Sequence, residues 1–414
     1  MAASIYLARP WFVDLSDVVG PWLAGYLIGF IAIIPGFMNA FVLIALIFDH
    51  RPAHKKTYTY PPITILVAAY NEADCIEDTL RSIYAQDYPG NLNIIVVNDG
   101  SRDDTDAKIR ALNGTIKPLQ LITLQSNQGK SAALNNALKH TTTDLLISID
   151  ADCYLLRHSI RNIVERYLSD PPNTAAVAGE ILIRNSRENW ITKAQEWDYF
   201  LGIAAVKRIQ SLFQGTLVAQ GAFSLYQKSA VEAAGGWPQT VGEDIVLTWT
   251  LLNAGYRIGH AEDACAFTNC PNTLGKFIRQ RQRWSRGLIE AFKANPSLMF
   301  KPRFSTMFIW WNALFPLLDI AYTIGFLPGI VLALFGHFWI VGPMTLLLLP
   351  AAALLNRVML RASEAMFKEQ HLTIRSNTFG FVIYMVAYSL ILQPACVWGY
   401  ISELLSLKKQ WGTK

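Results

Sequence analysis

The chain has 414 residues, of which 52% are hydrophobic and only 16% carry a charge, and its mean hydropathy is +0.24. This composition excludes an ordinary soluble enzyme of this length, and we expect part of the chain to lie in lipid. The net charge of +5 does not indicate nucleic-acid binding. The basic residues gather beside the hydrophobic segments, where the lipid bilayer and phosphate groups are the expected partners.

The first hydrophobic segment, residues 18–48, contains no charged residue. A helix needs about 20 residues to cross a bilayer, whereas the apolar part of a cleaved signal peptide has only about 7 to 15. Arg51, Lys55 and Lys56 follow the segment, and by the positive-inside rule they place the next residues in the cytoplasm and the N-terminus outside. Residues 1–56 are therefore predicted to form an N-terminal segment with one transmembrane helix.

Residues 57–272 have the mixed composition of a soluble, cytosolic domain. Short apolar runs predict strands that alternate with helical patterns: strands at 63–67, 92–97, 119–124 and 145–149, and helices at 76–85, 103–113 and ending at 138. This alternation predicts an α/β fold with a parallel-rich sheet covered by helices on both faces. Ligands bind at the carboxyl ends of the strands in such folds, and each polar motif described below follows a strand or begins a helix.

Three candidate ligand-binding motifs follow the first three strands. After the first strand, Tyr70 and Asn71 can line a nucleotide base, and Glu72 begins a helix. After the second strand, Asp99 can accept a hydrogen bond from a uracil N–H; the alternative is a turn that only caps the next helix. Lys130 lies at a helix start after a glycine, where its ammonium and nearby backbone N–H groups can meet a phosphate.

Asp150 and Asp152 directly follow the fourth strand. Two carboxylates at alternate positions can hold a divalent cation against a diphosphate, so we predict a Mg²⁺ or Mn²⁺ site here. The alternative is a turn that ends the strand.

The next two motifs are candidates for the chemistry and the acceptor site. Glu243 and Asp244 precede an apolar helical run, and Asp244 is the candidate general base for an acceptor hydroxyl. The alternative for this pair is an acidic helix start stabilised by the helix dipole. Gly221 and Phe223 can let backbone and an aromatic ring approach the acceptor; the alternative is a core strand.

Residues 273–303 are predicted to form amphipathic helices at the membrane interface. In a helix over 274–290, Gln280, Arg283 and Trp284 fall at i, i+3 and i+4 and share one face, which suits a diphosphate and a sugar ring. The alternative is a helix that only touches lipid headgroups through its basic residues, which are Lys276, Arg279, Arg281, Arg283 and Arg286.

Residues 304–414 form a predicted C-terminal transmembrane region of two to three spans, at 305–334, 337–356 and 377–404. With the N-terminal helix this gives three or four spans, and we favour four. A last crossing leaves the C-terminus outside, unless the last segment is a re-entrant or interfacial helix.

The motifs taken in order resemble the membrane-embedded processive glycosyltransferases of family 2, which synthesise cellulose, chitin, hyaluronan and poly-N-acetylglucosamine. The matching residues are Asn71-Glu72, Asp99, Asp150 and Asp152, Glu243-Asp244, and Gln280, Arg283 and Trp284. Asn98 departs from the aspartate that many relatives carry there. The resemblance implies a nucleotide-diphospho-sugar transferase fold on a transmembrane channel and an inverting reaction. It also implies that Asp99 binds uridine, Asp152 binds the metal and Asp244 binds the acceptor hydroxyl. Gln280, Arg283 and Trp284 are then expected to hold the diphosphate and the acceptor.

The expected activity is transfer of N-acetylglucosamine from a UDP-sugar donor onto a growing β-linked polysaccharide acceptor, with export across the plasma (inner) membrane. A compact channel of this kind is expected to need a small accessory membrane subunit or a homo-oligomer. Two alternatives remain: a transferase that makes one glycosylated lipid, and a non-catalytic membrane protein that senses nucleotide sugar.

Overall fold

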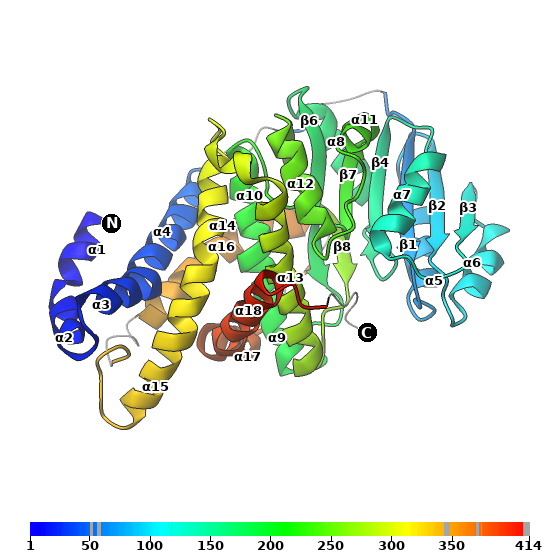
Figure 1. The fold of residues 1–414 in the computed structure, drawn as a ribbon. Coiled ribbons are helices and arrows are strands. Elements are labelled where there is room, and N and C mark those ends of the chain that lie inside the picture. Colours follow the sequence, from blue (N-terminus) through cyan, green and yellow to red (C-terminus); the bar gives the residue numbers. More distant parts are fainter. Residues whose placement is uncertain are drawn as a thin grey trace.

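A computed structural model describes residues 1–49, 53–55, 59–116, 118–342, 348–369, 372–373 and 375–408. Arg51 and Lys56, used above to orient the first helix, lie outside these residues. Figure 1 shows the sheet on the right and the apolar helices Pro21–Ile47 and Thr306–Leu334 on the left, with α13 (Leu274–Ala294) and the apolar helix Thr378–Leu404 near the middle.

The domain between the first two apolar helices is built on one eight-stranded sheet in the order β3-β2-β1-β4-β7-β6-β8-β5. Its strands are β1 (Ile63–Ala69), β2 (Leu92–Asn98), β3 (Leu119–Thr123), β4 (Leu145–Asp150), β5 (Tyr154–Leu155), β6 (Thr174–Ile183), β7 (Phe223–Gln227) and β8 (Arg257–Thr268). The first four strands are parallel, as predicted, whereas β7 runs antiparallel to both β4 and β6. The sheet is therefore mixed, and the carboxyl ends of β1, β2 and β4 meet at one edge.

Helices cover both faces of the sheet, because successive side chains of its buried strands alternate between the faces. Leu66 packs into one core cluster, while its neighbours Ile65 and Val67 pack into the other. One face is covered by α5 (Ile76–Tyr84), α6 (Thr105–Asn113) and α8 (Ser159–Ser169), and the other by α7 (Lys130–His140), α10 (Ala205–Leu212), α11 (Lys228–Ala233) and α12 (Glu243–Asn253).

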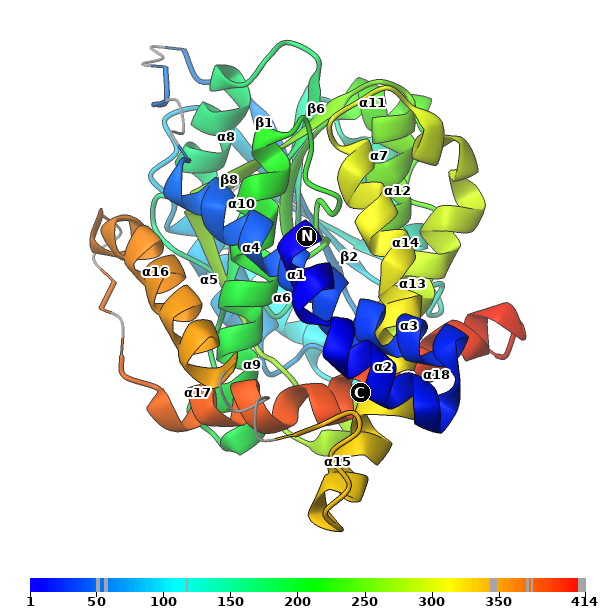
Figure 2. The same ribbon diagram turned by 90° about the vertical axis from the view of Figure 1, so that its left-hand side faces the viewer.

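Three helices are long and apolar enough to cross a membrane within the described residues: Pro21–Ile47, Thr306–Leu334 and Thr378–Leu404. Each contains a short π-helical segment, so they divide into α3 (Pro21–Ile28), η1 (Gly29–Ile33) and α4 (Ile34–Ile47); α14 (Thr306–Ala321), η4 (Tyr322–Phe326) and α15 (Leu327–Leu334); and α17 (Thr378–Ile383), η6 (Tyr384–Tyr388) and α18 (Ser389–Leu404). The predicted span 337–356 includes residues 343–347, which lie outside the described part. From Leu348 the chain continues as α16 (Leu348–Glu369), which Figure 2 shows beside α4.

The remaining described helices connect these parts. They are α1 (Ala2–Leu7), α2 (Arg9–Val19), α9 (Trp190–Trp197), the π-helix η2 (Asp198–Ala204) and the 3-10 helix η3 (Pro296–Phe300). Asp319, the acid within α14, accepts a hydrogen bond of 2.8 Å from the Tyr400 hydroxyl of α18, so two of the apolar helices are joined by a polar contact.

The end of α18 packs against α13: Glu403 forms ion pairs with Arg286 at 3.3 Å and with Lys293 at 3.0 Å. Arg286 also donates to the Leu407 carbonyl at 2.7 Å.

Candidate active site

The loops after β1 and β2 are tied together at the carboxyl edge of the sheet. The Asn71 N–H donates to the Ser101 hydroxyl at 3.0 Å, and the Asn71 side chain accepts from the Arg102 N–H at 2.9 Å. Asn71 adopts a left-handed backbone conformation (φ 54°), which asparagine tolerates better than most residues. The Glu72 N–H donates to Thr105, while the adjacent Tyr70 is 38% exposed at the rim.

Asp99 is almost fully buried, and both of its carboxylate oxygens bind the loop before α7. They accept the N–H groups of Gln128 and Gly129, each at 2.8 Å. Burial raises the pKa of Asp99, although these two hydrogen bonds oppose the shift. Asp99 therefore positions the start of α7, and with it Lys130.

The hydrogen bonds of Asn98 explain why this position does not carry the aspartate found in many relatives. Its side-chain oxygen accepts the Ser101 N–H at 3.0 Å, and its amide nitrogen donates to Asp106 at 2.9 Å. An aspartate has no N–H to donate and would face a second carboxylate.

Lys130 gathers charged residues from three elements into one cluster. Its ammonium forms an ion pair with Asp150 at the end of β4, and it lies 3.4 Å from Glu243 at the start of α12. Burial would lower the pKa of Lys130, but the two carboxylates outweigh it and raise the pKa. Gly221 belongs to the same cluster, because a Cβ there would lie 2.4 Å from the ammonium nitrogen. The predicted residues Lys130, Asp150, Gly221 and Glu243 are thus neighbours in space.

Glu243 and Asp244 occupy the first turn of α12 with different surroundings. Glu243 is 7% exposed, and burial raises its pKa to about 7 despite the opposing charge of Lys130. Asp244 is half-buried; it accepts the Ile245 N–H at 2.7 Å and the Gly221 N–H at 3.3 Å. The Asp244 carboxylate is therefore oriented by backbone groups while part of it stays accessible, as a general base requires.

Asp152 lies two residues beyond Asp150, next to β8. It accepts a long hydrogen bond of 3.5 Å from Thr268. In the described part of the chain, no three His, Cys, Asp or Glu side chains are grouped as a metal site. Two carboxylates are nevertheless what Mg²⁺ commonly takes from a protein when substrate phosphates supply its other ligands.

Phe223 does not face the cleft, contrary to the expectation. It is the first residue of β7, its side chain is fully buried, and a Cβ on Gly179 would lie 2.3 Å from its ring. The core-strand alternative is the one that the structure shows. The ring packs in the core, whereas the backbone before it reaches the charged cluster: the Gly221 N–H donates to Asp244, and the Ala222 carbonyl accepts the Asp150 N–H.

Gln280, Arg283 and Trp284, which were predicted to share one face of α13, differ in their exposure to solvent. Gln280 is 8% exposed and Trp284 is 38% exposed. Arg283 lies between these extremes, and its charge partly offsets the burial that raises the pKa of Glu243. This face of α13 therefore borders the charged cluster, with the Trp284 ring more open to solvent than Gln280.

Two residues near the site were not predicted. Arg281, assigned to lipid headgroups in the interfacial alternative, is instead 4% exposed within the protein. Lys207 of α10 is also buried, and burial lowers its pKa to about 8 while Glu180 and Asp244 oppose the shift. Neither position has a local sequence pattern that marks it, because the partners of both are distant in sequence.

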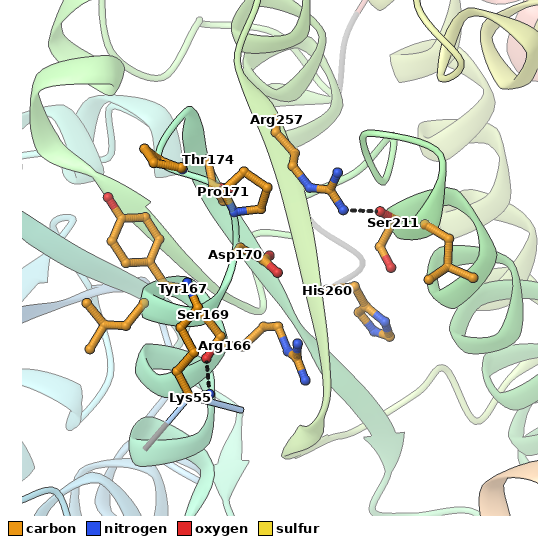
Figure 3. A pocket seen from close by; sticks show the side chains of 13 residues that line it. Lys55, Arg166, Tyr167, Ser169, Asp170, Pro171, Thr174, Ser211, Arg257 and His260 are labelled. Atoms are coloured by element: carbon orange, nitrogen blue, oxygen red, sulfur yellow. Dashed lines mark hydrogen bonds between the residues drawn. The ribbon is translucent and has the colours of Figure 1, made fainter. Parts of the chain in front are cut away.

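A separate cavity of about 560 Å³ lies where β6 and β8 begin, away from the carboxyl ends that carry the site (Figure 3). Arg166, Arg257 and His260 line it, and Arg257 donates to the Ser211 carbonyl. None of the predicted site residues lines this cavity.

The mixed sheet, with acidic residues at its carboxyl edge and α13 packed against the helix that begins with Glu243 and Asp244, defines a glycosyltransferase fold. A mannosyltransferase from Pyrobaculum calidifontis, solved in complex with GDP-Man and Mn²⁺, superposes with a TM-score of 0.63 at 20% identity, covering 93% of this chain and all (100%) of that one. Residues 64–235 match the family model described as Glycosyl transferase family 2. This match runs from β1 to just after α11 and covers less than half of the chain.

Curated relatives agree with this assignment. The chain is 37% identical over 229 residues to poly-beta-1,6-N-acetyl-D-glucosamine synthase of Staphylococcus aureus (strain MSSA476), covering 54% of each protein. It is 30% identical over 255 residues to an N-acetylglucosaminyltransferase of Rhizobium meliloti (strain 1021), covering 59% of each. The chain thus spans little more than half the length of these relatives.

Proposed function

We propose that this protein transfers N-acetylglucosamine from UDP-N-acetylglucosamine to the end of a growing β-linked polysaccharide at a membrane surface. The observation that carries the proposal is the charged cluster in which Lys130 joins Asp150 to Glu243, beside Asp244. The names of the two relatives support N-acetylglucosamine as the sugar.

The donor lies along the carboxyl edge of the sheet in this proposal. Tyr70, Asn71 and Asp99 bind the uridine, with Glu72 beginning the helix behind it, and Lys130 and Arg283 neutralise the diphosphate. The carboxylates of Asp150 and Asp152 suit a Mg²⁺ or Mn²⁺ ion, which when bound supplies positive charge to the leaving diphosphate. Because Lys130 already pairs with Asp150, Asp152 is the better candidate for the principal protein ligand.

The transfer step uses Asp244 as the base. Its carboxylate takes the proton of the acceptor hydroxyl as that oxygen forms a bond to the anomeric carbon of the donor sugar. The bond from that carbon to the phosphate oxygen breaks on the opposite side, and UDP leaves with the electron pair. Configuration at the carbon inverts, so an α-linked donor gives a β-linked product.

The membrane helices support a role in moving the product. The three apolar helices pack on the core of the sheet domain through Val42, Phe308 and Tyr400, and we assign the exposed Trp284 ring to the acceptor. We propose that the polymer remains bound between additions and leaves across the membrane, and that the domain faces the cytoplasm. An accessory subunit or a homo-oligomer completes the channel.

The test is synthesis by the purified full chain in lipid nanodiscs with a panel of UDP-sugars, measuring UDP release and product size. The proposal predicts release with UDP-N-acetylglucosamine, loss of release on chelation of divalent cations, and a ladder of polymer lengths. A single glycosylated lipid would support the one-sugar alternative, and absence of release with every donor and acceptor would overturn the enzymatic proposal.

A further inference from the structure

The last apolar helix meets the catalytic part at a buried charged cluster formed by Asp198, Arg281 and Tyr388. Arg281 Nη2 lies 2.8 Å from Asp198 Oδ2, with side-chain exposures of 5% and 11%. The Tyr388 hydroxyl donates to the same carboxylate oxygen at 3.0 Å. The three residues come from α13, η2 and η6, so three elements that are distant in sequence converge on one ion pair.

Arg281 also holds the Trp284 ring. Its guanidinium carbon lies 4.3 Å from the Trp284 ring centroid, 5.0 Å from that of Phe277 and 5.8 Å from that of Tyr388. A buried guanidinium over an indole is a favourable cation–π arrangement, because little water competes for the charge. One side of Trp284 is therefore fixed by a residue that is itself held by Asp198.

The last apolar helix is attached to the catalytic part on both sides of this cluster. At its start, Asn377 donates to the Lys193 carbonyl at 2.8 Å and accepts from the Trp197 indole N–H at 3.0 Å. At its end, Glu403 pairs with Arg286. The helix is thus fixed to α9 and to α13, and Asp198 begins the π-helix that continues α9. π-Helical segments such as η2 and η6 often occur at functional sites.

We propose that Arg281 is a positioning residue for acceptor binding: with Asp198 and the Tyr388 hydroxyl of the last apolar helix, it sets the orientation of the Trp284 ring. The inference rests on the proposed function, because it assigns the ring to the acceptor. It makes acceptor affinity depend on a membrane helix that contacts neither the donor nor the charged cluster around Lys130. Arg281 itself touches no reacting atom.

Tyr388→Phe tests the inference without removing a buried charge, and Tyr384→Phe is the matched control. Tyr384 lies in the same π-helical segment, with its ring 5.4 Å from that of Tyr388, and its hydroxyl has no hydrogen-bond partner among the described residues. For Tyr388→Phe we expect the acceptor KM to rise about 2- to 10-fold, as for loss of an ordinary hydrogen bond, with kcat and the donor KM unchanged. The control is expected to leave all three values unchanged.

A double-mutant comparison separates positioning from general destabilisation. In a Trp284→Ala background, Tyr388→Phe is expected to raise the acceptor KM no further, because the ring it orients is gone. Provided that the wild-type protein makes polymer, three results for Tyr388→Phe would each overturn the inference. They are an unchanged acceptor KM, equal changes in donor and acceptor KM, and a fully additive effect in the Trp284→Ala background. Failure of the wild-type protein to transfer any sugar would instead overturn the proposed function and this inference with it.

Discussion

Gly242 and Gly287 touch backbone to backbone where α12 crosses α13. A Cβ on Gly287 would lie 2.9 Å from the Gly242 Cα, and a Cβ on Gly242 would lie 2.6 Å from the Gly287 Cα. The contact is reinforced by Glu290 of α13, whose carboxylate accepts the Gly242 N–H at 2.9 Å. The helix that begins with Glu243 and Asp244 is therefore positioned directly by the helix that carries Gln280, Arg283 and Trp284.

Gly287→Ala is expected to force the two helices apart. Overpacking of this kind lowers the free energy of unfolding by about 1 to 3 kcal/mol. Because the displacement also moves Asp244 relative to α13, we expect turnover to fall by more than this loss of stability alone would cause. Gly275→Ala, in the first turn of the same helix, is the control: only the end of the Arg279 side chain lies near its added Cβ, at 3.8 Å. Thermal unfolding and UDP release by both variants check the prediction, and normal turnover by Gly287→Ala would contradict it.

Glu243 makes stability depend on pH. Burial raises its pKa from 4.5 to about 7, so the folded protein binds this proton more tightly than the unfolded chain does. The resulting stabilisation is present below about pH 4.5 and is lost as the pH rises through about 7. Glu243→Gln cannot ionise, and we expect it to gain about 3 kcal/mol relative to the wild-type protein at pH 8 and little at pH 4.

The control for this pH dependence is Glu232→Gln, since the Glu232 side chain is 52% exposed. Thermal unfolding in detergent at both pH values measures the effect. A Glu243→Gln variant whose stability relative to the wild-type protein is the same at pH 4 and pH 8 would show that the buried carboxyl does not titrate as described.

The Asn98→Asp variant tests whether the hydrogen bond from Asn98 to Asp106 explains the absence of the aspartate found in many relatives. The change replaces an N–H donor to Asp106 with a carboxylate, and we expect it to lower the free energy of unfolding by about 1 to 3 kcal/mol at neutral pH. Asp106→Asn in the same chain restores a donor and is expected to recover part of that loss. Urea or thermal unfolding of the two single variants and the double variant gives the coupling, and simple additivity would count against the explanation.

The sequence allowed most of the sheet and its carboxyl edge to be predicted, because these depend on local patterns. The buried β-branched runs of β1, β2 and β4 and the polar residues that follow them placed Asn71, Asp99 and Asp150 at one edge. The helix that carries Gln280 and Trp284 was predicted in the same way, from the spacing of its residues.

Interactions between distant segments could not be predicted in this way. Arg281 and Arg283 are both basic residues of one amphipathic helix, and only the approach of Asp198 and Tyr388 buries the first of them. Phe223 was placed in the cleft because it follows Gly221, but the alternation of side chains along β7 turns its ring into the core. The contact between the end of α18 and α13 depends on the pairing of Glu403 with Arg286, which no local pattern reveals.

Turnover by Asp244→Asn, measured beside donor binding, tests the central claim most directly. The amide cannot take the acceptor proton but keeps the size of the carboxylate and one oxygen to accept the Gly221 or Ile245 N–H. We predict that UDP-N-acetylglucosamine still binds while polymer synthesis falls by about 100-fold or more, the usual contribution of a general base. Near-normal synthesis by Asp244→Asn, with the wild-type protein active in the same lipid, would contradict the account.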